Sequence, residues 1–147
     1  MTAAATSIQG KVADLPDLIA WAEDGLRLQS AQCKSCGTYF FPASHHQHRP
    51  GCSREGVENV LLGKRGKLAT YSVQHYMCPP PFNTADDITP YGVAMVEFPE
   101  GISVAGLIME TDLNTLEIGL EMETIEYALR KDEEGADVCT WAFKAVN

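Results

Sequence analysis

The sequence is short of basic residues, and this shortage limits the partners that the protein can bind. Its 147 residues include 11 Lys and Arg against 20 Asp and Glu, which gives a net charge of −9. Binding to nucleic acid requires a basic surface that neutralises phosphates. The composition therefore argues against a nucleic-acid partner.

Several targeting and cofactor-binding patterns are also missing. The first residues show no basic region followed by an apolar run, so we expect no signal peptide. No apolar run approaches the length of a transmembrane helix, so we expect no membrane association. Neither a P-loop nor a dinucleotide-binding glycine fingerprint is present. The five cysteines do not form the even framework of a secreted disulfide protein, which favours a cytoplasmic location.

What the sequence does have is a concentration of thiols and imidazoles within residues 33–56. Cys33 and Cys36 have the C-x-x-C spacing and are followed by Gly37, so a tight turn can direct two thiolates at one point. Cys52 follows in a second glycine-bracketed turn, where Glu55 takes the position of a fourth cysteine. A redox pair usually opens a helix, whereas aromatic residues and a proline follow here. This pattern predicts a zinc site.

Tetrahedral zinc needs a fourth ligand beside the three thiolates. His48 is favoured because three residues separate it from Cys52, a spacing that is common in finger-like sites. His46, His45 and Glu55 remain alternatives. The predicted ligands are Cys33, Cys36, His48 and Cys52. Four protein ligands leave no position for water or substrate, so we expect a structural zinc ion that stabilises a small lobe.

The N-terminal part, residues 1–25, is predicted to contain a short helix over residues 14–25. Asp14 can cap such a helix, Pro16 suits its first turn, and Gly25 can end it in a left-handed turn. Because so short a helix has little stability alone, we expect it to pack against its own domain or a partner.

Residues 26–62 are predicted to form the zinc-binding lobe, and residues 63–147 a small antiparallel β-barrel. The lobe has one alternating strand before its first cysteine turn and one after its second, at 26–32 and 57–62. Five strands rich in β-formers follow, at 68–75, 91–98, 102–108, 122–127 and 138–143. The fourth of these alternates imperfectly, which predicts a bulge.

Two segments of the barrel half invite a functional interpretation. Residues 76–92 are proline-rich and too long for a hairpin, and a stiff loop with apolar residues can dock without losing much entropy. We expect this loop to contact a partner, with simple coverage of a barrel end as the alternative. Residues 63–67 form a basic, glycine-containing turn that we expect to be solvated, with binding of CoA phosphates as the alternative.

The order of the motifs resembles one protein family. Residues 63–75 read Gly-x-x-Gly-x-Leu-x-x-Tyr-Ser-Val-x-His, and residues 90–101 read Pro-Tyr-Gly-Val-Ala-Met-Val-Glu-Phe-x-Glu-Gly. Preceded by a helix and two cysteine turns, these segments resemble the acyl-CoA-associated zinc-ribbon/OB-fold family over roughly residues 14–145. Glu55 is a departure, because it leaves the family's site without its fourth cysteine.

The resemblance implies both a fold and a partner. The implied fold is mainly β, with the N-terminal helix and a rubredoxin-like zinc ribbon followed by a five-stranded OB-fold barrel. The implied role is that of a non-catalytic accessory subunit in a heteromeric complex with a thiolase-fold catalytic subunit. That complex binds the CoA thioester and makes or breaks carbon–carbon bonds. Within the family, the pattern is most similar to the small subunits of benzoylsuccinyl-CoA thiolases of anaerobic toluene degradation.

The alternative function is a freestanding binding module or a small Cys/His hydrolase. Cys78 lies three residues after His75, but no oxyanion-hole glycine motif lies beside it and no third group is placed to orient the histidine. Cys139 falls within a predicted strand, where a core position is expected. Structural roles are therefore expected for both thiols, and no catalytic residue is assigned to this chain.

Overall fold

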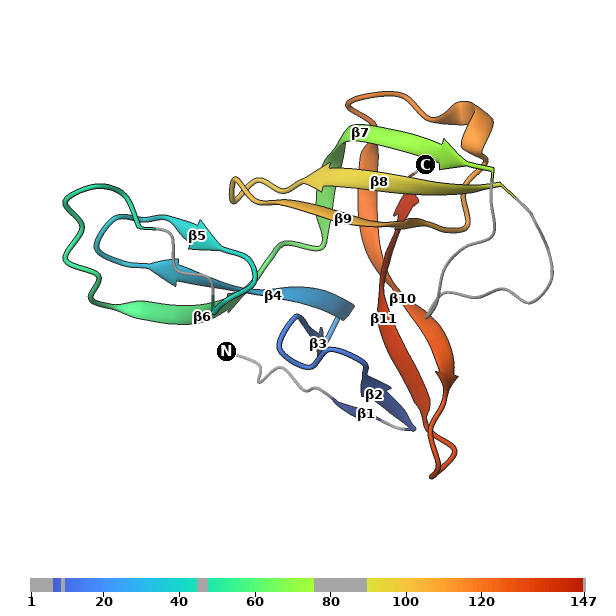
Figure 1. The fold of residues 1–147 in the computed structure, drawn as a ribbon, viewed down its shortest axis with the longest axis horizontal. Coiled ribbons are helices and arrows are strands. Elements are labelled where there is room, and N and C mark those ends of the chain that lie inside the picture. Colours follow the sequence, from blue (N-terminus) through green and yellow to red (C-terminus); the bar gives the residue numbers. More distant parts are fainter. Residues whose placement is uncertain (1–6, 9, 45–47, 76–89, 147) are drawn as a thin grey trace.

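The protein is built almost entirely of β-strands. A computed structural model describes residues 7–8, 10–44, 48–75 and 90–146 (Figure 1). The described residues form no α-helix, and their only helical element is the 3-10 turn η1, Leu113–Thr115. The strands are β1 Ser7–Ile8, β2 Lys11–Ala13, β3 Ile19–Ala22, β4 Gly25–Cys33, β5 Tyr39–Phe40, β6 Val57–Leu61, β7 Arg65–Gln74, β8 Tyr91–Glu97, β9 Ser103–Ile108, β10 Glu121–Lys131 and β11 Asp137–Ala145.

Strands β7 to β11 form a closed barrel. Its sheet order is β7-β8-β9-β11-β10, and β10 pairs again with β7 to complete the ring. All of these pairings are antiparallel except the contact of β9 with β11, where Phe143 lies opposite Ile108 and its carbonyl accepts the Met109 N–H at 2.8 Å. The five-stranded barrel that the alternating sequence predicts is therefore confirmed.

Strand β8 alternates as its sequence predicts, whereas β11 is buried in longer runs. In β8, Gly92, Ala94 and Val96 are buried, while the residues between them are half-buried. Strand β10 does carry an irregularity, but it lies between Ala128 and Arg130, beyond the range of the predicted strand. Closing the barrel brings backbone and side chains into tight contact at Gly106. A Cβ there would lie 2.7 Å from Phe143 Cε2 and 2.9 Å from Trp141 Nε1.

The predicted N-terminal helix is wrong. Only one turn forms, in which the Leu18 N–H donates to the Leu15 carbonyl at 2.9 Å, and the chain then enters β3. Residues 19–21 are all buried, whereas an amphipathic helix would expose one side. Trp21 pairs with Leu26 across a tight hairpin, and Gly25, with φ of 113°, belongs to this hairpin and ends no helix. Tertiary burial thus overrides the capping signals.

Strand β4 connects the barrel to a second lobe. Its first residues, including Leu26 and Leu28, lie in the main hydrophobic core, and it ends at Cys33 beside β5 and β6. We call residues 29–61 the Cys-His lobe. Figure 1 shows this lobe projecting from one side of the barrel. Among the residues of the lobe that the structure describes, its own hydrophobic cluster contains three buried ones, Ala31, Cys33 and Phe40.

A small set of contacts joins the Cys-His lobe to the barrel. The Phe41 ring meets the Trp141 ring edge-on, with centroids 6.4 Å apart. At the connection, the Gly63 N–H donates to Glu100 Oε2 at 2.9 Å, and Arg27 Nε donates to the Leu62 carbonyl at 2.9 Å. These contacts orient the lobe without making one continuous core.

The basic segment at residues 63–67 is not the turn that the sequence predicts, because β7 begins at Arg65, although Arg65 and Lys67 are exposed to solvent as expected. The Lys64 ammonium donates to the Asp24 carbonyl, and Arg65 lies near Glu121 and Glu123, at 3.8 and 4.0 Å. Two of its three charges are therefore engaged within the chain. The proline-rich segment falls mostly outside the described residues, so its expected contact with a partner stays a prediction. Within the described ranges, no helix is long and apolar enough to cross a membrane.

Candidate metal centre

The first cysteine turn follows directly from β4. Cys33 is the last residue of the strand, and the Gly37 N–H donates to the Cys33 carbonyl at 2.7 Å, which closes the turn around Cys36. Gly37 has a φ of 74°, a left-handed conformation that glycine adopts without steric cost. The C-x-x-C-G spacing therefore produces the tight turn that the sequence predicts.

The second turn presents Cys52 from the opposite side. The Cys52 N–H donates to the Arg49 carbonyl at 3.1 Å, and the Arg54 N–H donates to Cys52 Sγ at 3.2 Å. The two turns are joined by a hydrogen bond of 3.1 Å from the Lys34 N–H to the Gly56 carbonyl. The backbone thereby holds both turns together before any ligand–metal bond is considered.

The four predicted ligands come together at this junction. One ligand atom each from Cys33, Cys36, His48 and Cys52 lies within 4.8 Å of the others. The sulfurs of Cys33 and Cys52 are 3.6 Å apart, and His48 Nδ1 lies 3.4 Å from Cys52 Sγ and 3.9 Å from Cys36 Sγ. Zinc bond lengths in a tetrahedron imply about 3.8 Å between two sulfurs and about 3.6 Å between sulfur and nitrogen. The geometry and the soft donor set therefore fit a closed zinc site.

Local hydrogen bonds favour the thiolate at Cys36. The Thr38 hydroxyl, 3.3 Å from Cys36 Sγ, is the main cause that lowers the pKa of Cys36 to about 5. Burial raises the pKa of Cys52, and the Arg54 N–H opposes this shift. Since a metal binds the thiolate and not the thiol, Cys36 is prepared for ligation at neutral pH without any help from the metal.

Of the candidates for the fourth ligand, the structure describes His48 and Glu55, and it favours His48. The His48 ring lies in the ligand group and also meets Phe40 edge-on, with centroids 5.0 Å apart. The Glu55 side chain is exposed and outside the group, while its carbonyl accepts a hydrogen bond from the Ser35 hydroxyl at 2.7 Å. His45 and His46 lie outside the described residues.

Sequence reasoning missed the residues that support the thiolates. Thr38 and Arg54 each follow a ligand cysteine by two residues, and each places a hydrogen-bonding group at that sulfur. The two-residue offset that they share is a signal in the sequence, because a polar group placed just after a cysteine in a tight turn can reach its sulfur and support it, as groups around a metal site do.

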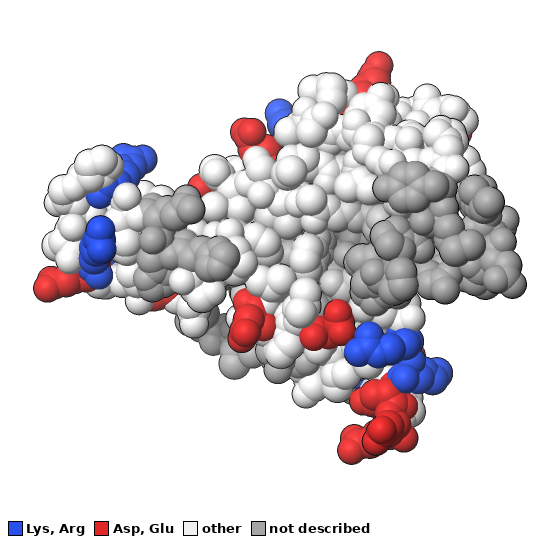
Figure 2. Space-filling model, in the orientation of Figure 1, with Lys and Arg blue, Asp and Glu red and all other residues white. Residues whose placement is uncertain are grey.

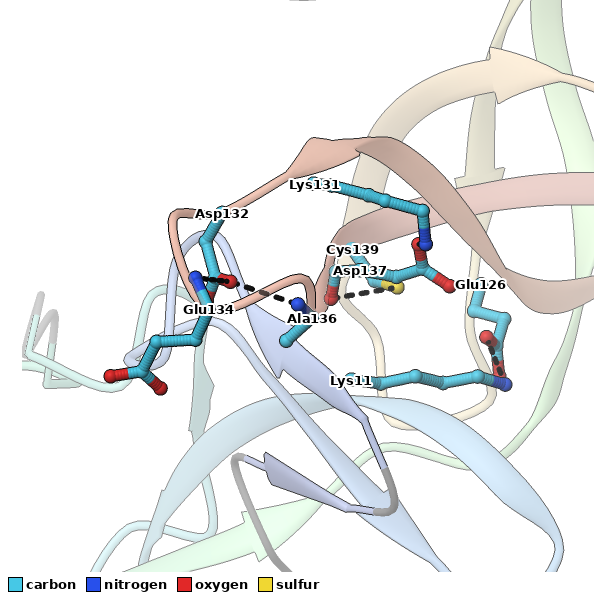
Figure 3. A network of polar contacts seen from close by, with 8 residues as sticks. All are labelled: Lys11, Glu126, Lys131, Asp132, Glu134, Ala136, Asp137 and Cys139. Carbon is cyan, nitrogen blue, oxygen red and sulfur yellow. Dashed lines mark hydrogen bonds and ion pairs between the residues drawn. The ribbon is translucent and has the colours of Figure 1, made fainter.

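The remaining described thiol is remote from the metal centre. Cys139 lies in β11 and is fully buried, as the sequence predicts for a core residue. Figure 3 shows it between Asp137 and the Lys11–Glu126 ion pair, which is 2.7 Å long. Burial is the main cause that raises the pKa of Cys139, and the nearby carboxylates add to it. Such a thiol is a poor nucleophile. Cys78 lies outside the described residues.

The chain thus has an OB-type strand order next to a three-cysteine, one-histidine group. Residues 59–126 match the family described as "ChsH2, C-terminal OB-fold domain". A "DUF35 domain-containing scaffold protein" of Methanothermobacter thermautotrophicus is 36% identical over 119 residues, which cover 80% of this chain and 84% of that protein. The chain therefore belongs to the DUF35 family, and the resemblance drawn from its motifs is confirmed.

Two further relatives are more distant. "Benzoylsuccinyl-CoA thiolase subunit BbsA" of Thauera aromatica is 26% identical over 133 residues, which cover 89% of this chain and 86% of that subunit. Among solved structures, the "Ltp2-ChsH2(DUF35) aldolase" aligns with a TM-score of 0.56 and 24% identity, covering 81% of this chain and 84% of that one. The structural match supports the fold.

Proposed function

We propose that this chain is a non-catalytic, zinc-binding accessory subunit of a thiolase-type complex that acts on CoA thioesters. The observation that carries this proposal is the relationship to DUF35 scaffold proteins over four-fifths of both chains. The BbsA relative, which is a thiolase subunit by name, supports a thiolase-fold partner for this chain as well.

The role of the metal in this proposal is structural. Zinc bound by Cys33, Cys36, His48 and Cys52 has a complete coordination sphere and supplies stability to a lobe with a very small core. The Cys-His lobe is then a rubredoxin-like zinc ribbon. The proposed domain limits are 1–25 for the N-terminal segment, 26–62 for the ribbon and 63–147 for the OB-fold domain.

The chemistry in this proposal belongs to the partner. The described cysteines are either in the metal-binding group or, as for Cys139, buried in the barrel, so none is placed as an exposed nucleophile. The reactive cysteine and the CoA thioester site are therefore assigned to the complex and its catalytic subunit. Benzoylsuccinyl-CoA thiolase of aromatic degradation in the cytoplasm is the specific reaction that the BbsA relative favours.

Purification of the native complex tests this proposal. The chain, tagged at one terminus and purified from its source cells, is expected to elute with a thiolase-fold protein in a fixed ratio and with one zinc per copy. A chain that elutes alone at every protein concentration would reject the accessory role. Zinc-free protein that still forms the complex would reject only the metal assignment.

A further inference from the structure

The Cys-His lobe differs in charge from the rest of this acidic protein. Between Cys33 and Glu58, three basic residues stand against two acidic ones, a local charge of +1. The remaining residues of the chain, 8 basic and 18 acidic, carry −10. The basic residues of this segment are Lys34, Arg49 and Arg54. Figure 2 shows Lys and Arg side chains over the projecting lobe with an acidic group at its outer edge, and groups of both signs over the rest of this face.

Two of these basic side chains form no ion pair with an acidic residue that the structure describes. Of the chain's basic residues, seven form ion pairs within the described residues: Lys11, Arg27, Lys34, Arg65, Arg130, Lys131 and Lys144. Lys64 donates to a backbone carbonyl. Within the described part of the chain, the side chains of Arg49, Arg54 and Lys67 form neither an ion pair nor a hydrogen bond to a backbone carbonyl. Both arginines are exposed, and they flank Cys52 in the second metal turn.

The backbone makes the position of Arg54 unusual. Arg54 has a φ of 64°, a left-handed conformation that a residue with a Cβ adopts at a steric cost and that glycine adopts freely. Its N–H is held by Cys52 Sγ, so the metal turn fixes this conformation and directs the side chain. A long basic side chain at a position suited to glycine indicates a role for that side chain.

We propose that Arg49 and Arg54 form a positive docking tip that contacts an acidic surface of the thiolase-fold catalytic subunit. This inference rests on the proposed function. A protein surface is favoured over a small anion because the arginines lie on a projecting lobe, whereas small-molecule sites are concave. An acidic partner is repelled by the net negative charge of the rest of the chain and attracted by the two arginines of the tip. Charge complementarity of this kind fixes the orientation of docking and speeds association.

Association kinetics of the two purified subunits test the proposal. The variant R49E/R54E reverses both charges, and K67E is the matched control, because Lys67 is equally exposed and unpaired but lies on the barrel. We expect R49E/R54E to lower the association rate constant at 50 mM NaCl by about tenfold or more, and K67E by less than about twofold. We also expect wild-type association to slow as NaCl rises to 500 mM.

Different outcomes separate the possible failures. A complex of wild-type subunits that is insensitive to both salt and R49E/R54E overturns the docking tip and leaves the accessory role intact. Absence of any wild-type complex overturns both. CoA binding by the wild-type complex that R49E/R54E abolishes, with subunit association unchanged, would assign the arginines to phosphates and also overturn the proposal. Two controls separate loss of charge from local unfolding of the lobe. Zinc content is measured for each variant, and the conservative variant R49Q/R54Q should slow association while keeping its zinc.

Discussion

The barrel and the Cys-His lobe are stabilised in different ways. Among the described residues, the main hydrophobic cluster, which fills the barrel and the β3–β4 hairpin, contains 15 buried residues, whereas the cluster of the Cys-His lobe contains three. Burial of this order suffices for a small barrel but not for a lobe of that size. In the lobe, we propose that metal binding by the three cysteines and His48 takes the place of a core. We therefore expect the barrel and the Cys-His lobe to unfold independently of each other.

Loss of a metal ligand should have the largest effect, and it should be confined to the lobe. We expect Cys36→Ser to lower the bound zinc toward zero and to abolish amide protection in β5 and β6, because metal binding in small zinc units contributes about 10 kcal/mol or more to folding. Barrel amides should keep their protection. Elemental analysis and hydrogen exchange measure both effects.

The matched control for this variant is Cys139→Ser, which places a hydroxyl in the barrel core. It should keep its zinc and destabilise the barrel by about 1–3 kcal/mol, since the shorter serine side chain places its hydroxyl farther than the thiol from the Asp137 carbonyl, which accepts from Cys139 Sγ at 3.7 Å. If both variants lost zinc equally, the independence of the two parts would be refuted.

A cavity in the barrel should produce the opposite pattern. Phe143 is fully buried and packs against Phe98, with ring centroids 6.2 Å apart. We expect Phe143→Ala to lower the free energy of unfolding of the barrel by about 3–5 kcal/mol. Denaturant titration followed by circular dichroism measures the loss. Zinc content should stay at the wild-type level. Loss of zinc would contradict the independence of the barrel and the Cys-His lobe.

The identity of the fourth zinc ligand can be tested by substituting His48 and Glu55 in turn. We expect His48→Ala to weaken zinc binding by about a hundredfold or more, because a ligand contributes more than the supporting groups around a site. Glu55→Gln should leave the affinity unchanged, because the Glu55 side chain is exposed and outside the ligand group. Competition with a chromophoric chelator measures both affinities. Equal effects of the two variants would exclude His48 as the particular ligand.

The smallest effect is expected at the junction of the two parts. Phe41→Ala removes the edge-on contact with Trp141 and should cost about 0.5–1.5 kcal/mol. The Trp141 indole N–H donates to the Ala105 carbonyl at 2.9 Å, so its NMR resonance reports on this contact. The resonance should shift in Phe41→Ala but not in the control Tyr39→Ala, an aromatic residue of the same lobe. An unchanged resonance in Phe41→Ala would mean that the ring contact does not couple the two parts.

Local patterns in the sequence predict the barrel strands and the grouping of three cysteines with one histidine, for physical reasons. A strand such as β8 alternates with period two because one of its faces is buried. The grouping is predictable because the spacing of Cys33, Cys36 and Cys52 fixes the two turns locally, and His48 follows from its distance to Cys52 along the chain.

The N-terminal region is where sequence reasoning fails. Asp14 and Pro16 are good helix-starting residues, but the burial of Trp21 on all sides depends on β4 and on distant barrel strands. The short strand β2 is equally unpredictable from its sequence, because besides the two-residue strand β1 it pairs with β11 at the other end of the chain. Contacts of long range decide both elements, and no local pattern encodes them.

The proposed assignment of catalysis to a thiolase-fold subunit, and of support to this chain, is tested most directly by a thiolysis assay on purified components. The same CoA thioester is offered to this chain alone, to the thiolase-fold subunit alone and to the reconstituted complex. We predict no turnover by this chain and full turnover only by the complex. Turnover by this chain alone at the rate of the complex would contradict the account, because it would place the reactive group here.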